Sequence, residues 1–264
     1  MKRQFIMYIG IFAFFLLGSC GDYVTGSLEE SNNPLLVNPY ESVGILHNEG
    51  LDYVLKNTPD LRSLDDEADT DLLLAVLEES AEQYLDSISG DLSLLSHGST
   101  VGKSYSFVRN VNSSVQEDSL ALSVGAQRML DKILDVSMSD DFVFVSTNLQ
   151  SLEQKIMKNE DEYTDYECFV LLSATAIGRY SSDYWGAVQE GSTSDLRAVA
   201  WKAIVGADVA GGVWGAVRHG PEILIGGMLG GAAGAISCGA RHVLKGAIVG
   251  SAKAGIAAGV AELL

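Results

Sequence analysis

Apolar residues recur at helical spacing through most of the chain between residues 38 and 190. The segment NPYESVGILHNEGLDYVLKN begins with Asn38 at an N-cap position and Pro39 at the first helical position. Its apolar stripe consists of Val43, His47, Leu51 and Val54. This spacing predicts a first amphipathic helix with one face turned to a core.

Four more helices are predicted before residue 190. They run from Thr70 to about Ile88, over residues 119–138, over residues 149–158 and over residues 163–187. The last is apolar on several sides, which predicts a central place in a bundle. The isolated run DFVFV (141–145) has strand propensity and is expected to be a short extended segment. Residues 38–190 are long enough for one helical domain with its own core.

After the GSTSD break at residues 191–195, small residues recur every four positions. A period of four places them on one helix face, where another helix backbone can approach closely, and a flexible linker would lack this register. Three helices are predicted, over residues 198–217, 222–240 and 243–263, with polar breaks at RHGP and RH. The predicted fold is therefore all-α, a helical bundle domain followed by a three-helix glycine-zipper hairpin over residues 198–264. The helix-packing glycines are Gly211, Gly215, Gly226, Gly230, Gly234, Gly246, Gly250, Gly255 and Gly259.

Membrane insertion and packing in water are both open for this hairpin. Residues 223–240 would span about 27 Å as a helix, close to a hydrocarbon thickness, but glycine and alanine are only weakly apolar. Asp208 and Lys253 lie near the middles of the two flanking helices, where an unpaired charge is costly in lipid. An up-down-up arrangement would place them at similar depth, so an Asp208–Lys253 ion pair is one hypothesis. Two partly exposed charges at the edge of a soluble hairpin are the other.

Basic residues collect at one end of the predicted hairpin. Arg197, Lys202, Arg241 and Lys245 lie at the end joined to residues 38–190, and Arg218 lies alone at the other end. If residues 38–190 are exported, this distribution is opposite to that of an ordinary inner-membrane span. The hairpin is therefore expected either to pack as a glycine-rich domain or to insert after export.

The first residues carry an export signal. Lys2 and Arg3 precede the uncharged run 5–17, and Leu-Gly-Ser-Cys follows, ending at Cys20. This pattern is typical of a secretory signal and is too short for a normal membrane span. The ending resembles the bacterial lipobox, which implies cleavage before Cys20 and acylation of its thiol. Residues 1–19 are then the lipoprotein signal peptide and residues 20–37 a flexible tether; an ordinary signal peptide that ends in cysteine is the alternative.

Two further resemblances agree with an envelope protein. The GxxxG-rich tail resembles the glycine-zipper segments of bacterial envelope lipoproteins and of two-peptide bacteriocins. The segment NPYESVGILHNEGLDYVL (38–55) is similar to the opening of uncharacterised lipoproteins from Bacteroidota, a family that brings no assigned activity. The resemblances imply an exported protein, lipid-anchored in the bacterial cell envelope, with the outer membrane favoured over the inner.

Charge is distributed unevenly over the 264 residues. Residues 20–197 hold 10 Lys and Arg against 32 Asp and Glu, whereas residues 198–264 hold 5 against 3. Such an acidic body repels phosphate backbones, which argues against nucleic-acid binding. Cys168 and Cys238 could pair in an exported chain, but their apolar helical surroundings favour buried free thiols.

Two segments resemble ligand-binding motifs, but neither has the full pattern. HGSTVGKS (97–104) lacks the glycine spacing of a phosphate loop, and EADTDLLLAVLE (67–78) has Leu72 where a calcium loop needs glycine. His47 is interpreted as a core histidine, and the other histidines, His97, His219 and His242, show no triad spacing. No active site, metal site or cofactor is therefore predicted.

The sequence predicts a non-enzymatic cell-envelope lipoprotein whose tail mediates membrane association or helix self-assembly. Its expected partners are membrane lipid, through Cys20, and a second copy, through the small-residue helix faces. A membrane-damaging effector is the alternative, and a ligand-binding or enzymatic domain in residues 38–190 is a third class.

Overall fold

The computed structural model describes residues 36–57, 70–90, 92, 122–190 and 198–257. Over these ranges the chain forms seven α-helices and one short 3-10 helix and contains no strand, which confirms the all-α prediction. The helices are α2 (Glu41–Asn57), α3 (Thr70–Ser87), α6 (Val124–Ser137), α7 (Phe142–Lys158), η2 (Glu160–Glu162), α8 (Asp165–Glu190), α9 (Ala198–Arg218) and α10 (Gly220–Ala257).

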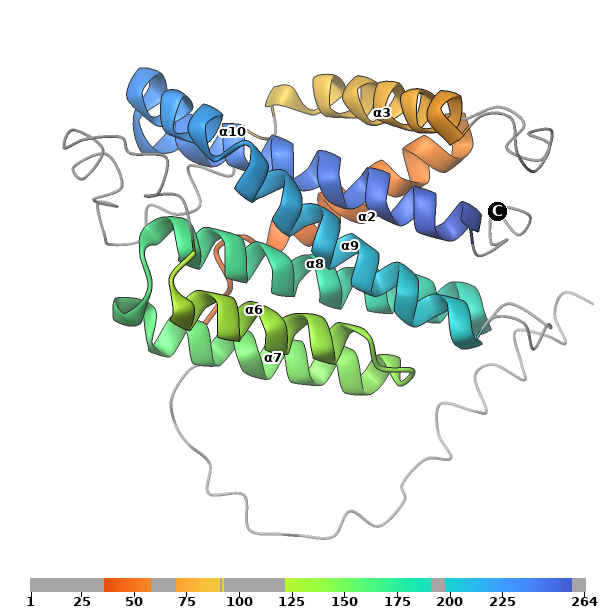
Figure 1. The fold of residues 1–264 in the computed structure, drawn as a ribbon, viewed down its shortest axis with the longest axis horizontal. Coiled ribbons are helices and arrows are strands. Elements are labelled where there is room, and N and C mark those ends of the chain that lie inside the picture. The colour runs from red at the N-terminus through yellow and green to blue at the C-terminus, as the bar shows by residue number, and fades with distance from the viewer. Residues whose placement is uncertain (1–35, 58–69, 91, 93–121, 191–197, 258–264) are drawn as a thin grey trace, which may run out of the picture. The chain divides into compact units, whose positions relative to one another are not determined.

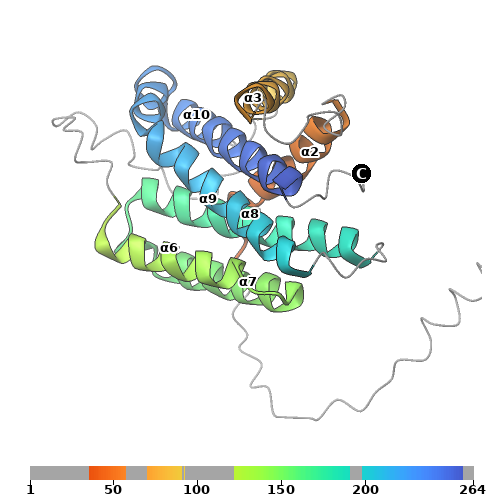
Figure 2. The same cartoon turned by 45° about the vertical axis from the view of Figure 1, so that its right-hand side comes forward.

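The helices lie in three layers, with α8 in the middle one. Helices α6 and α7 cover one side of it, and α2, α3 and α10 pack together on the other side (Figures 1 and 2). Helix α9 packs against α8, α6 and α10. The prediction that residues 163–187 are central is confirmed, because α8 contacts α2, α6, α7 and α9.

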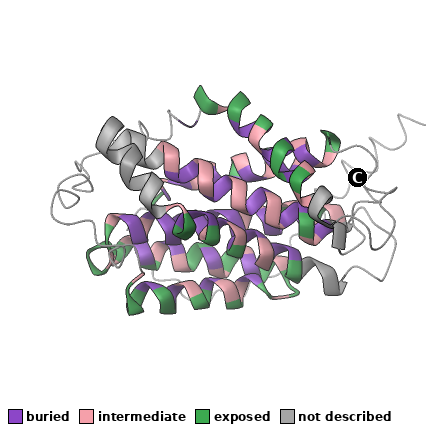
Figure 3. Ribbon diagram, turned by 45° about the horizontal axis from the view of Figure 1, so that its top comes forward, coloured by how far each residue is buried: buried purple, intermediate pink, exposed green. Residues whose placement is uncertain are grey.

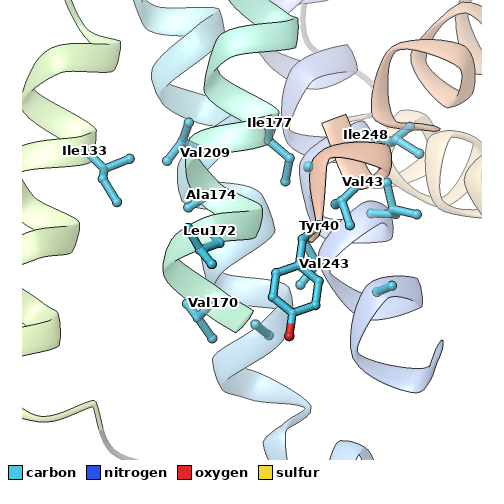
Figure 4. Packing of buried hydrophobic residues seen from close by; sticks show 14 of the residues in the cluster. Tyr40, Val43, Ile133, Val170, Leu172, Ala174, Ile177, Val209, Val243 and Ile248 are labelled. Atoms are coloured by element: carbon cyan, nitrogen blue, oxygen red, sulfur yellow. The ribbon is translucent and has the colours of Figure 1, made fainter. Parts of the chain in front are cut away.

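The core is assembled from all of these helices. Ile133 of α6, Ile177 of α8, Val209 of α9 and Ile248 of α10 belong to one buried cluster (Figure 4). Buried positions lie on the faces that the helices turn toward one another, as the purple bands in Figure 3 show. Amphipathic stripes in separate sequence segments therefore share one hydrophobic core.

The segment before α2 is held by a buried asparagine. The side chain of Asn38 accepts a hydrogen bond from the backbone N–H of Tyr40 at 2.9 Å and donates to Glu153 at 2.8 Å and to the Leu172 carbonyl at 2.9 Å. Arg179 in turn donates to Glu153 at 3.2 Å. Asn38 thus caps the turn at residues 39–40 and ties that turn to α7 and α8, while α2 itself begins at Glu41, two residues later than the predicted first helical position.

The expected extended segment at residues 141–145 is wrong, because α7 begins at Phe142. Asp141 is the N-cap, and its carboxylate accepts a hydrogen bond from the Phe144 N–H at 2.9 Å. Val145 and Leu149 then continue a buried helical stripe. Tertiary burial of that stripe, together with the cap, overrides the local strand propensity of DFVFV.

The third helix expected in the glycine-rich tail does not exist as a separate element. The break at RHGP is present between α9 and α10, but α10 continues without interruption through Arg241 and His242. Neither residue is a strong helix breaker, and the side chain of Arg241 binds α3 instead of marking a turn. The glycine-rich helices pack against α8 and α2, within the compact unit Leu36–Leu264.

Candidate functional site

The most unusual chemistry of the described core is a buried polar cluster around Asp208 of α9. Its side chain lies beside Ser181 and Trp185 of α8, Ser251 of α10 and His47 of α2. Asp208, His47, Ser181 and Ser251 are all 0% exposed. Four helices thus bring an acid, an imidazole and two hydroxyl groups together inside the core.

Glycines in α2 allow His47 to reach this position. A Cβ at Gly44 would lie 2.6 Å from the Ala176 carbonyl oxygen of α8, and one at Gly50 would lie 2.6 Å from the ring of Tyr84. These approaches require glycine, although glycine in a helix interior costs about 1 kcal/mol relative to alanine. Gly44 and Gly50 were not singled out from the sequence. Their place on the buried face of an otherwise regular amphipathic helix is the signal that could have found them.

The two ring nitrogens of His47 face different partners. Asn48 donates through Nδ2 to the Tyr180 carbonyl at 2.8 Å, so its Oδ1 is left to accept from His47 Nδ1 at 2.9 Å. The other ring nitrogen, Nε2, faces Asp208, with 3.8 Å between Nε2 and Oδ2. Ser181 donates to the same carboxyl oxygen, whereas Ser251 Oγ faces the group without a well-formed hydrogen bond.

Burial holds both ionisable groups neutral near pH 7. Desolvation raises the pKa of Asp208 to about 8, although Ser181, Ser251 and Trp185 stabilise its charged form. Desolvation also lowers the pKa of His47 to about 4, opposed by Asn48 and the Ala247 carbonyl. The 3.8 Å approach of the two side chains is therefore mainly a contact between a carboxylic acid and a neutral imidazole, not an ion pair.

This cluster presents no exposed side chain to a substrate. Its Ser, His and Asp side chains also lack the order of a catalytic triad, because Ser181 bonds to the acid and not to the imidazole. Within the described ranges, no three His, Cys, Asp or Glu side chains lie close enough to hold a metal ion.

The structure does not bring Asp208 and Lys253 together. Lys253 is exposed, whereas Asp208 is fully buried among α2, α8 and α10. The ion-pair hypothesis assumed parallel first and third helices separated by a break near Arg241. Because α10 has no such break and its later part runs antiparallel to α9, that register does not exist.

Four of the predicted packing glycines lie where α9 crosses the later part of α10. A Cβ at Gly211 would collide with the Gly246 carbonyl, and one at Gly215 would collide with the carbonyl of His242. A Cβ at Gly250 would lie 2.9 Å from the Ala207 carbonyl oxygen. At this crossing the two helices therefore meet backbone to backbone, within one chain.

The other predicted positions have different surroundings or lie outside the description. A Cβ at Gly255 would make an ordinary contact of 3.7 Å with Trp185. Gly226, Gly230 and Gly234 belong to α10, but their packing is outside the described part, and Cys20 and Gly259 lie outside the described residues altogether. Cys168 and Cys238 are not joined by a disulfide.

Two basic residues of α10, Arg241 and Lys245, have partners on α3. Arg241 donates to Glu82 at 2.5 Å and to Asp86 at 2.6 Å, and Lys245 donates to Glu82 at 2.7 Å. Arg241 and Lys245 therefore serve a contact between α10 and α3. Among the helices that the structure describes, none is long and apolar enough to cross a membrane.

Comparison with known proteins returns no relative. No protein-family model, no curated protein and no solved structure matches this chain.

Proposed function

We propose that the chain is a non-enzymatic lipoprotein of the bacterial cell envelope, anchored by acyl chains on Cys20, whose glycine-rich helices form part of its own core. The observation that carries this proposal is the backbone contact between α9 and α10 at Gly211, Gly215 and Gly246. Small-residue faces often join separate chains or separate membrane helices. At this crossing the small residues of α9 and of the later part of α10 pack against each other, which supports a role in internal packing.

The anchoring part of the proposal depends on Leu-Gly-Ser-Cys at residues 17–20 and on the short apolar run before it. Several acyl chains would hold the protein firmly, whereas a single chain gives only reversible binding. The buried Asp208 cluster has the character of a core polar network, so the proposal assigns it a structural role.

Membrane fractionation tests the proposal. The Cys20→Ala variant, exported behind a non-lipoprotein signal, should be released by alkaline carbonate as a folded helical protein. Labelled palmitate should enter the wild type and the control variant Cys168→Ser, but not Cys20→Ala. Failure of the wild type to take up the label would refute lipidation, and retention of Cys20→Ala in the membrane would refute a purely internal role for the hairpin.

A second candidate is a membrane-damaging effector in which α9 and α10 leave the bundle. One observation favours it, namely the exposed apolar side of α9, where Trp214 is 64% exposed and Val217 is 36% exposed. Tryptophan is typical of side chains that settle at a membrane interface. Leakage of dye from liposomes at neutral pH would support this candidate, and intact liposomes would leave the anchored, passive role.

A further inference from the structure

The outer face of α7 carries no acidic side chain, although the protein has a net charge of −18. The single acid of this helix, Glu153, is buried and bonded to Arg179 and Asn38. The exposed residues of α7 are apolar, uncharged polar or basic. They are Val143, Phe144, Thr147, Gln150, Ser151, Lys155 and Lys158.

The outer faces of other helices in the bundle are different. Helix α3 exposes Glu78, Glu79 and Asp86, and α6 exposes Asp131 and Asp135. Among the described helices, α7 packs mainly against α6 and α8, and no other described helix covers its remaining side at the edge of the bundle (Figures 1 and 2). On this side Val143 is 77% exposed and Phe144 is 47% exposed. An acid-free surface with exposed apolar groups is therefore a distinct feature of α7.

The chain from Cys20 arrives on this same helix. Leu36 donates its N–H to the side chain of Gln154 at 3.1 Å and accepts from it through its carbonyl at 2.6 Å. Leu36 and Val37 are 43% and 78% exposed, and they add apolar surface at that point. Gln154 and Val143 are eleven positions apart, close to three helical turns, and so lie on nearly the same side of α7.

We propose that this surface, the α7 outer face together with Leu36 and Val37, lies against the bilayer that holds the acyl chains of Cys20. This inference rests on the proposed function, because it requires an anchored chain. The 15 residues between Cys20 and Leu36 span at most about 55 Å, so the bundle stays close to the bilayer. The face next to Leu36 can approach the bilayer whether those 15 residues are compact or extended. The opposite face could approach it only if those residues passed around the bundle.

The chemistry of the face suits shallow contact with lipid headgroups. Lys155 and Lys158 can pair with phosphate, and Val143 and Phe144 can enter the interface between headgroups and acyl chains. Acidic groups border the face at both ends, with Asp140 and Asp141 before α7 and η2 after it. These carboxylates are repelled by anionic lipid, which restricts the contact to the side of the helix.

Position-specific quenching tests the orientation. The mature lipidated chain, with Cys168→Ser and Cys238→Ser, would carry an environment-sensitive fluorophore at Ser151→Cys, at Glu79→Cys on α3 or at Trp214→Cys on α9. On vesicles of phosphatidylethanolamine and phosphatidylglycerol that contain spin-labelled lipid, quenching at 151 should be at least about twofold stronger than at 79 and at 214. Adding Thr147→Glu and Gln150→Glu should weaken quenching at 151, whereas the matched change Gln83→Glu on α3 should not.

The outcomes separate this inference from the proposed function. Equal quenching at all three positions would overturn it, and strongest quenching at 214 would place the apolar side of α9 on the bilayer instead. If palmitate labelling fails, the same measurement would use a chain with Cys20 replaced by a hexahistidine tag on nickel-chelating lipid. Stronger quenching at 151 in that arrangement would still support the α7 orientation, and equal quenching would refute it independently of lipidation.

Discussion

A single methyl group at Gly246 should weaken the whole bundle. The Cβ of Gly246→Ala would collide with the carbonyl oxygen of Gly211 and would lie 2.9 Å from the carbonyl carbon of Gly211. It would also lie 3.3 Å from Cα of Gly215. Comfortable contacts between heavy atoms are about 3.5–4.0 Å, so the two backbones must separate by about 1 Å. All three contacts are to backbone atoms, which cannot move aside as a flexible side chain can.

The expected loss follows from two opposing effects. Overpacking of this kind costs about 1–3 kcal/mol, and more where backbone must shift. The greater helix propensity of alanine returns up to about 1 kcal/mol. We therefore expect Gly246→Ala to lower the free energy of unfolding by about 2 kcal/mol. For a protein of this length the melting temperature should fall by about 4–8 °C.

Gly255→Ala is the matched control on the same helix. Its Cβ would meet Trp185 at 3.7 Å, an ordinary contact, so helix propensity should dominate. This variant should equal the wild type in stability or exceed it by up to about 1 kcal/mol. Gly211→Ala together with Gly246→Ala should cost less than the sum of the two single changes, because the first methyl group already separates the helices.

Urea unfolding followed by helical circular dichroism measures these differences, and an unchanged slope with a shifted midpoint identifies a change in native stability. Equal midpoints for Gly246→Ala and Gly255→Ala would refute the close crossing of α9 and α10. Equal midpoints would also remove the support for internal packing of α9 against α10, which depends on their backbone contact.

Three further predictions concern buried charge and helix contacts. Between about pH 6.5 and 8, wild-type stability should fall by about 1 kcal/mol per pH unit, because folded Asp208 keeps a proton that the unfolded chain has lost. Between about pH 4 and 6.5 the lowered pKa of His47 makes stability rise with pH, and this rise should offset the fall caused by Asp208. In Asp208→Asn only the rise caused by His47 should remain. Asp208→Ala and Lys253→Ala should act additively on urea unfolding, with Lys253→Ala changing stability by less than about 0.5 kcal/mol, because that side chain is exposed. Arg241→Ala should speed hydrogen exchange in α3 and cost about 0.5–1 kcal/mol, since it removes ion pairs to Glu82 and Asp86.

Each of these predictions has a clear contrary result. A wild-type profile that is flat from pH 6.5 to 8 would show that Asp208 is ionised in the folded protein. Strong non-additivity between Asp208→Ala and Lys253→Ala would restore the ion-pair hypothesis. Unchanged exchange in α3 after Arg241→Ala, with Lys56→Ala as the control for an exposed ion pair, would show that apolar packing alone holds that helix.

Particular residues show how far sequence reasoning reached. The stripe of Val43, His47, Leu51 and Val54 predicted the buried face of α2, and all four side chains are buried. Helical periodicity is a local property, so it is visible in one segment without knowledge of its neighbours. The same reasoning failed at Phe142 and at Arg241, where strand propensity and a polar pair suggested boundaries that the structure does not have.

The sequence by itself determined the all-α class, the faces that enter the core and the four-residue rows of small side chains, because each depends on the spacing of side chains along one helix. The tertiary structure decided the partners. Asp208 meets Ser181 and His47 instead of Lys253, and Gly211 meets Gly246 of the same chain. These pairings depend on how helices distant in sequence cross, and the register of a crossing is set by close packing across the whole core and not by the pattern of either helix alone.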